Sequence, residues 1–215
     1  MADKPNKVKY NLKNTHYAVI TTGEDGAVKF GTPVPMPGSV SLSLDANGEP
    51  ENFYADGGVY YVINNNTGYE GDLELALIPE SFRTDILKEE LDEKGVLIEN
   101  SEVELGTFAL LFEFDGDQKH IRHVMYNCSA SRPGIEGKTN EDKKEVQTEK
   151  LTINAVPLPN GMVKAKTGNT TDATTYADWY KAVYMPPVAN TCMPAYAQHI
   201  IVLATVVAPS RPSAT

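Results

Sequence analysis

Alternation of apolar and polar residues is the most frequent pattern along this chain. In residues 39–44 one valine and two leucines share one face of an extended strand, and three serines share the other. The same alternation recurs in residues 72–77, and in residues 108–114 three phenylalanines and a leucine share one face of a strand. The pattern predicts short antiparallel strands, with an apolar face packed in a core and a polar face in water.

Further segments are rich in β-forming residues without strict alternation, and they predict additional strands. Turn residues separate them, for example Asp115-Gly116-Asp117, which predicts a hairpin. These segments are residues 15–22, 27–30, 121–130, 151–156 and 163–166. Many short strands at near-regular spacing predict a mainly β chain, formally α+β, folded as an antiparallel β-sandwich or barrel.

One segment has helical rather than strand periodicity. Apolar side chains at helical spacing follow Pro79, and Gly95 is a suitable stop. The stripe consists of Phe82, Ile86, Leu87 and Leu91. It predicts one flanking α-helix at about residues 80–93, and residues 172–183 predict a short helix or turn that closes a core edge.

Changes in composition divide the chain into three parts. Residues 1–14 are polar, contain four lysines and predict an N-terminal arm without a core of its own. Residues 15–185 form the β domain, interrupted by a protruding excursion at about residues 45–68. Residues 186–215 hold five prolines and many alanines, and they predict a C-terminal extension of a different character.

The excursion carries aromatic residues but lacks the continuous apolar face of a core strand. Such a segment is expected to find its partners on another subunit. We therefore predict inter-subunit contacts for its aromatic residues and for one tyrosine of the arm. These residues are Phe53, Tyr54, Tyr60, Tyr61 and Tyr10.

Composition limits the functions open to the chain. With 215 residues, of which 41% are hydrophobic, it can bury the core of one domain. The formal net charge of −10 argues against gripping nucleic acid through its phosphates, which requires a basic face. An acidic surface would instead repel DNA.

No targeting segment is expected. Residues 1–7 lack the apolar stretch of a secretion signal, and the longest apolar run, residues 200–208, is far below the ~20 residues of a membrane helix. Cys128 and Cys192 are far apart and are expected to be reduced thiols in a protein made in the cytoplasm.

The chain offers little that points to chemistry. His120 and His123 could join Cys128 at a metal, but a strand would place the two histidines on opposite faces. The oxygen-rich turns lack the register of a calcium loop, and no nucleotide-binding, serine-hydrolase or zinc-protease motif is present in the sequence. We therefore predict no catalytic, cofactor or metal site, and a protein that is not an enzyme.

Five stretches in order resemble a known family. They are VKYNLKNTHYA (8–18), TPVPMPGSVSLSL (32–44), GYEGDLELALIP (68–79), FALLFEFDGD (108–117) and Trp179-Tyr180. Together they span residues 8 to about 185, and residues 186–215 do not match. The chain thus resembles the major tail (tail-tube) proteins of long-tailed bacteriophages and prophages of Gram-positive bacteria.

This resemblance implies a tail-tube fold and a structural role in a virion. Subunits of that family form hexameric rings that stack into a hollow tube for DNA ejection, without catalysis or a cofactor. The implied partners are other copies of the chain, together with tape-measure and tail terminator or initiator proteins. DNA would pass through the lumen without specific binding, and the particle would assemble in the host bacterial cytoplasm without involving a membrane.

A tube requires a wet inner surface, and the small polar faces of two strands are the candidates. Acidic residues there would keep DNA moving. The predicted lumen-lining residues are Ser39, Ser41, Ser43, Asp72 and Glu74.

Two other classes of protein remain open. A carbohydrate- or receptor-binding β-sandwich module would present exposed aromatics in a shallow groove and would not self-assemble. A hydrolase on a β scaffold would need a convergent polar pocket with perturbed titrating groups.

Overall fold

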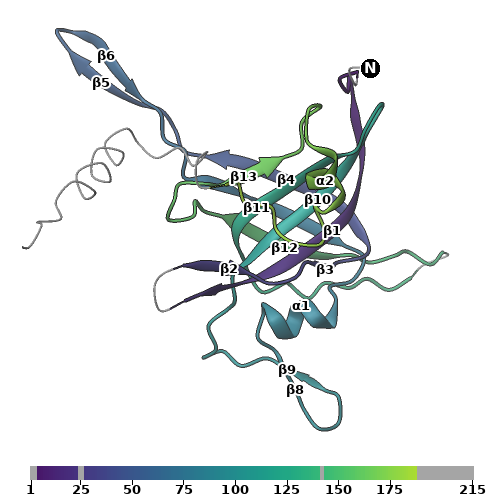
Figure 1. The fold of residues 1–215 in the computed structure, drawn as a ribbon. Coiled ribbons are helices and arrows are strands. Elements are labelled where there is room, and N and C mark those ends of the chain that lie inside the picture. Colours follow the sequence, from purple (N-terminus) through teal and green to yellow (C-terminus); the bar gives the residue numbers. More distant parts are fainter. Residues whose placement is uncertain (1–3, 24–26, 141–142, 188–215) are drawn as a thin grey trace, which may run out of the picture.

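The computed structural model describes residues 4–23, 27–140 and 143–187. One antiparallel sheet dominates it, with the strand order β2-β1-β10-β11-β12-β7-β4, β13 beside β11 and β3 beside β1 (Figure 1). The strands are β1 (Lys9–Thr22), β2 (Val28–Phe30), β3 (Val34–Pro35), β4 (Ser39–Asn47), β7 (Gly68–Leu75), β10 (Phe108–Gly116), β11 (Ile121–Ala130), β12 (Glu149–Ala155) and β13 (Lys164–Lys166). The predicted mainly β, antiparallel sandwich class is confirmed.

The main core lies where this sheet folds over on itself. Strands β4, β7 and β12 pack their apolar rows against β1, β10 and β11. Leu42 lies beside Leu73, and both point inward as the alternation read from the sequence predicts; Leu151 lies beside Leu73 on the next strand. Leu77 was predicted to face inward too, but it is 67% exposed because β7 ends at Leu75.

A second apolar layer covers the outer face of β1, β10 and β11. Alanine and leucine residues that alternate with the main-core residues of β10 point into it, together with Val124 and Tyr126 of β11. The segment containing α2 (Ala173–Ala177) lies over this face and inserts Trp179, which is 2% exposed. Strand β10 is therefore buried on both sides, which explains its nearly continuous apolar sequence.

The predicted flanking helix is shorter than expected. Helix α1 covers only Glu80–Asp85, and Ile86 and Leu87 follow it as buried residues of the main core. The ring of Phe82 packs edge-on against Tyr17 and Phe108, at 5.1 and 5.2 Å between centroids. The apolar stripe thus closes one end of the sandwich through the short helix α1 and the two residues that follow it.

The second half of the predicted helix is a small hairpin, β8 (Glu90–Leu91) and β9 (Leu97–Ile98). Lys88 has a φ of 58°, which ends the helical conformation before Leu91. The carboxylate of Asp92 accepts the backbone N–H groups of Lys94 and Val96, and this turn chemistry competes with a helix. Leu91 is 56% exposed and does not belong to the buried stripe.

The predicted N-terminal arm is also shorter than expected. Strand β1 begins at Lys9 and pairs with β10, so residues 9–14 belong to the sheet. Asn11 and Asn14 have positive φ values at the two register shifts, a conformation that asparagine tolerates and that lets the strand bend. The Asn6 side chain accepts the N–H groups of Gln118 and Lys119, which ties residues before the strand to the β10–β11 turn.

Two further observations concern the ends of the chain and membranes. From residue 188 on, the predicted C-terminal extension lies outside the described residues. Within the described part of the chain, no helix is both long and apolar enough to cross a membrane.

Candidate assembly surfaces

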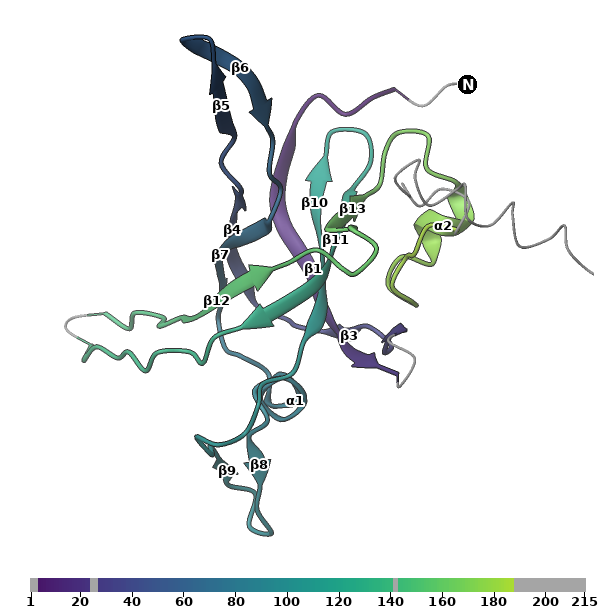
Figure 2. The same cartoon turned by 90° about the vertical axis from the view of Figure 1, so that its left-hand side faces the viewer.

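The most exposed apolar element is a hairpin formed by β5 (Glu51–Ala55) and β6 (Gly58–Ile63), which we call the aromatic hairpin. Its two strands pair only with each other, and it projects well beyond the sandwich (Figures 1 and 2). It occupies the excursion expected at residues 45–68, although residues 45–47 still belong to β4. Exposed fractions of its predicted contact residues are 56% for Phe53, 64% for Tyr54, 72% for Tyr60 and 64% for Tyr61.

Both faces of the aromatic hairpin carry apolar side chains. Phe53 pairs with Tyr61 and Tyr54 with Val59, with a register shift between the two pairs, and all four residues are exposed. A two-stranded hairpin is marginally stable alone, and a large exposed apolar patch usually marks an interaction surface. The other predicted contact residue, Tyr10, is 55% exposed but lies in β1, apart from the hairpin in the sheet order.

A second surface is the solvent-facing side of β4, β7 and β12, which we call the polar face. Its residues form cross-strand rows that repeat every second position. The rows are Ser41–Glu74–Lys150, Ser43–Asp72–Thr152 and Asp45–Glu70–Asn154. The structure therefore brings four of the five predicted lumen residues together on one polar surface.

Ser39 is the predicted lumen residue that does not join the polar face. A register shift between Ser39 and Ser41 pairs Ser39 with the buried Leu75. Its hydroxyl donates to the hydroxyl of Thr15, 2.6 Å away, and Thr15 is itself buried. The bulge reverses the alternation, because one extra residue flips the side chain to the other side of the sheet.

Hydrogen bonds favour the charged form of two carboxylates of the polar face, Asp72 and Glu74. Bonds from Lys150 and then Thr152 lower the pKa of Asp72, and bonds from Thr148 and Ser41 lower the pKa of Glu74. Lys150 lies 2.8 Å from Asp72 and offsets part of the negative charge. With Asp45 and Glu70 the face carries four carboxylates and one lysine, so it remains acidic near neutral pH.

A third surface is an open groove of about 220 Å³ at the mouth of the sandwich, which we call the basic groove. Leu42, Leu44, Phe112 and Met125 form its floor, and Lys9, Tyr69, Phe114, His123 and Lys164 surround them. The Lys164 ammonium lies over the Tyr69 ring at 4.2 Å, and the Lys9 ammonium lies over the Phe114 ring at 4.7 Å. Cations thus stand on aromatic walls around an apolar floor.

The basic groove changes the titration of His123, whose ring stacks on Phe112 at 5.0 Å. Burial, and then the positive charges of Lys166, Lys9 and Lys164, lower its pKa from 6.5 to about 4. The unfolded chain therefore binds more protons between these pH values, and stability falls as pH drops through this window. At 1.36 kcal/mol per pH unit, the full loss is about 3 kcal/mol.

We predict that His123→Phe removes this part of the pH dependence. The free energy of unfolding, measured in urea at pH 6.5 and pH 4, should fall by about 2–3 kcal/mol less in the variant than in the wild type. Carboxylates titrate equally in both proteins, so the difference isolates the histidine. Parallel pH profiles for the two proteins would contradict this assignment.

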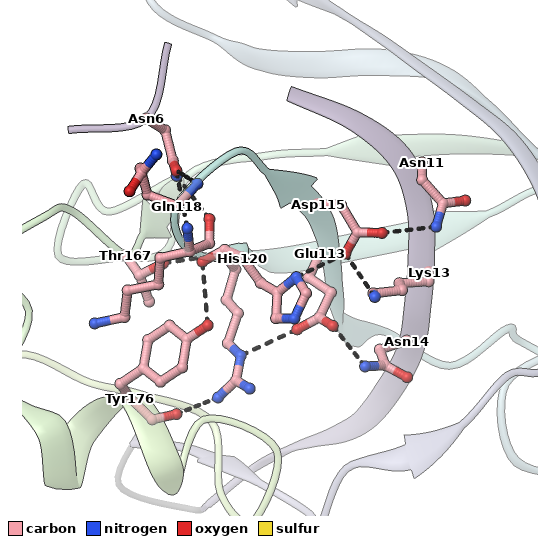
Figure 3. Close-up of polar contacts among 12 residues, drawn as sticks. Asn6, Asn11, Lys13, Asn14, Glu113, Asp115, Gln118, His120, Thr167 and Tyr176 are labelled. Carbon is pink, nitrogen blue, oxygen red and sulfur yellow. Dashed lines mark hydrogen bonds and ion pairs between the residues drawn. The ribbon is translucent and has the colours of Figure 1, made fainter. Parts of the chain in front are cut away.

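A buried polar cluster joins β1, β10, β11 and α2 (Figure 3). Its centre is Glu113, which is 2% exposed and accepts a bond from Arg122 Nε at 3.0 Å. The Asn14 amide donates to the other carboxylate oxygen at 2.6 Å. Nearby, Asp115 contacts Lys13 at 2.5 Å and His120 at 2.6 Å.

This cluster fixes the C-terminal segment of the domain onto the sheet. The Arg122 guanidinium stacks on the Tyr176 ring at 3.9 Å and on the Tyr180 ring at 5.3 Å, and it donates to the Tyr176 carbonyl. The Tyr180 hydroxyl donates to Glu113 at 3.3 Å. These contacts tie residues 176–180 to the Glu113–Arg122 pair on β10 and β11.

The residues considered for a metal site have other surroundings. His120 faces Asp115, His123 stacks on Phe112, and Cys128 is fully buried, which raises the pKa of its thiol to about 12. Among the described residues, no group of three or more His, Cys, Asp or Glu side chains is placed to hold a metal ion.

Known proteins resemble this chain only distantly. No protein-family model and no curated protein matches the sequence. Two solved structures resemble the fold, each with 8% identity and a TM-score of 0.40. The match to the tube-terminating cap of the anti-feeding prophage covers 77% of this chain and 96% of that chain. The match to the sheath/tube terminator of an extracellular contractile injection system covers 78% of this chain and 100% of that chain. At these values the likeness does not extend to function.

Three features of the structure were not predicted from the sequence. The basic groove joins residues from six strands, so no local sequence pattern predicts it. The Glu113–Arg122 pair was visible only as a charged residue between Phe112 and Phe114, which is an anomaly in an apolar strand. The β8–β9 hairpin could have been suggested by Asp92 and Gly95, which are typical turn residues.

Proposed function

We propose that this chain is the major tail-tube subunit of a bacteriophage or prophage tail. Copies assemble into rings, hexameric by the family resemblance, and the rings stack into a hollow conduit for DNA. The role is structural, with no catalysis and no cofactor. Other copies are the main partners, tape-measure and terminator or initiator proteins meet the ends of the tube, and the finished protein resides in the virion.

The aromatic hairpin is the observation that carries this proposal. Four aromatic side chains, each more than half exposed, stand on an element that pairs with no other strand described. Each Å² of apolar surface left in water costs about 25 cal/mol, so burial of these side chains against another chain is strongly favoured. In an assembly of identical subunits, neighbouring copies bury these side chains.

The polar face supports the conduit. Its cross-strand rows consist of polar and charged residues, and hydrogen bonds favour the charged form of Asp72 and Glu74. Such a surface repels the phosphates of DNA, and its one lysine, Lys150, is paired with Asp72. We propose that Ser41, Ser43, Asp72 and Glu74 line the lumen.

A labelling experiment tests the lumen assignment. Ser43→Cys and, as an outward control, Ile135→Cys are prepared with Cys192 replaced by serine; Cys128 is buried. In assembled tubes a bulky polymer-linked maleimide should label residue 43 at least roughly tenfold more slowly than in monomers, because the lumen excludes it. Equal labelling of residue 43 in tubes and monomers would place the polar face outside.

The alternative is a carbohydrate- or receptor-binding module. Its aromatic residues are expected in a shallow groove, whereas the most exposed aromatics here stand on a projecting hairpin. Mass photometry of the purified chain separates the two functions. Assemblies at multiples of the 23.5 kDa subunit mass support the tube subunit, and monomers at all concentrations support the binding module.

A further inference from the structure

We infer that the β8–β9 hairpin of one copy docks into the basic groove of the next copy. The inference rests on the proposed self-assembly and deepens it, because it names a head-to-tail contact between two different surfaces. This docking contact is separate from the contact that buries the aromatic hairpin between subunits.

The two surfaces lie at opposite ends of the subunit. Strand β7 runs from Tyr69, at the basic groove, to Leu75, next to the α1 end. Figure 2 shows β8, β9 and α1 at the bottom, and the starts of β1 and β11 at the other end of the sandwich. A copy therefore cannot fill its own groove with its own β8–β9 hairpin. A contact between unlike ends repeats from copy to copy and produces a stack.

The charges of the two ends are complementary. Residues 88–104 contain seven carboxylates and two lysines. Within the described part of the chain, Glu90 and Glu93 form no ion pair and both are exposed. At the other end Lys9 and Lys164 flank the basic groove and are equally free of ion pairs among the described residues. A positive groove on a protein of net charge −10 suits an acidic partner, and another copy provides one.

Apolar surface is complementary as well. Leu91, Val96 and Ile98 are exposed by 56, 54 and 48% on a hairpin of only a few residues. The floor of the basic groove is apolar, with Leu42, Leu44 and Phe112 among its residues. Aliphatic side chains of the hairpin would rest on this floor, and its carboxylates would meet the lysines at the rim. Interfaces with an apolar centre and a charged rim have this composition.

Charge reversal tests the contact in the full chain. We compare Glu90→Lys/Glu93→Lys, Lys9→Glu/Lys164→Glu and the fourfold variant that combines them. A matched control, Glu136→Lys/Glu145→Lys, makes the same change of charge on the exposed β11–β12 loop. Each double reversal should raise the critical concentration for assembly at least roughly tenfold, because like charges then face each other.

The fourfold variant should assemble again, within roughly threefold of the wild type, because the charges are complementary once more. The control should assemble like the wild type. If the double reversals leave assembly unchanged, or if the fourfold variant stays as defective as they are, the docking contact is wrong while self-assembly stands. If the wild-type chain itself does not assemble, the proposed function fails first.

Discussion

Replacing Phe53, Tyr54, Tyr60 and Tyr61 together by serine is expected to abolish assembly and to leave a folded monomer. The four rings are exposed in the isolated subunit, so their removal costs little in folding. In an assembly the same rings are buried, and each aromatic anchor is typically worth about 2 kcal/mol or more at the centre of an interface. The binding free energy lost with four anchors is then larger than the free energy that holds an ordinary subunit contact together.

The measurement combines light scattering for assembly with thermal unfolding for the monomer. Ile135→Ser/Val146→Ser is the control, since both residues are exposed apolar side chains on the β11–β12 loop. The control should assemble, and the Tm of the fourfold variant should stay within about 3 °C of the wild type. Normal assembly of the fourfold variant would show that the aromatic hairpin serves another purpose.

Replacing Arg122 by alanine is expected to destabilise the fold by about 3–5 kcal/mol. The change leaves the buried Glu113 carboxylate without its charged partner, which is the costly case for a buried ion pair. It also removes the guanidinium that stacks on Tyr176 and Tyr180. The loss should appear in urea unfolding as a lower midpoint, with the α2 segment the first to lose protection from hydrogen exchange.

A paired variant separates lost charge from lost packing. Arg122→Met alone keeps much of the side-chain volume but strands the carboxylate, whereas Arg122→Met/Glu113→Leu removes both charges. The double variant should therefore be more stable than Arg122→Met by about 2 kcal/mol. A double variant no more stable than Arg122→Met would mean that Glu113 is satisfied by Asn14 and Tyr180 without the arginine.

The parts of the fold that were predictable are those where local pattern and burial agree. Alternation around Leu42 and Leu73 placed two strands with the correct face inward, because one face meets the core and the other meets water. It failed where a single residue broke the period. The bulge at Val40 moved Ser39 to the core side, and nothing in six alternating residues signals an inserted residue.

The helix shows a different limit. Phe82, Ile86 and Leu87 are buried as predicted, but helical spacing continued past them by chance to Leu91. Local turn chemistry at Asp92 decided the structure there, since an exposed segment gains nothing from a helical stripe. Surfaces were predictable only where they are local, as in the aromatic hairpin. The basic groove depends on which strands become neighbours, and that information is not local.

Electron microscopy of the purified full-length chain tests the central claim most directly. We expect stacked rings that form tubes of constant diameter, with the polar face toward the lumen and the aromatic hairpins buried between subunits. Discrete monomers at all protein concentrations, or single rings that never stack, would contradict a major tail-tube subunit.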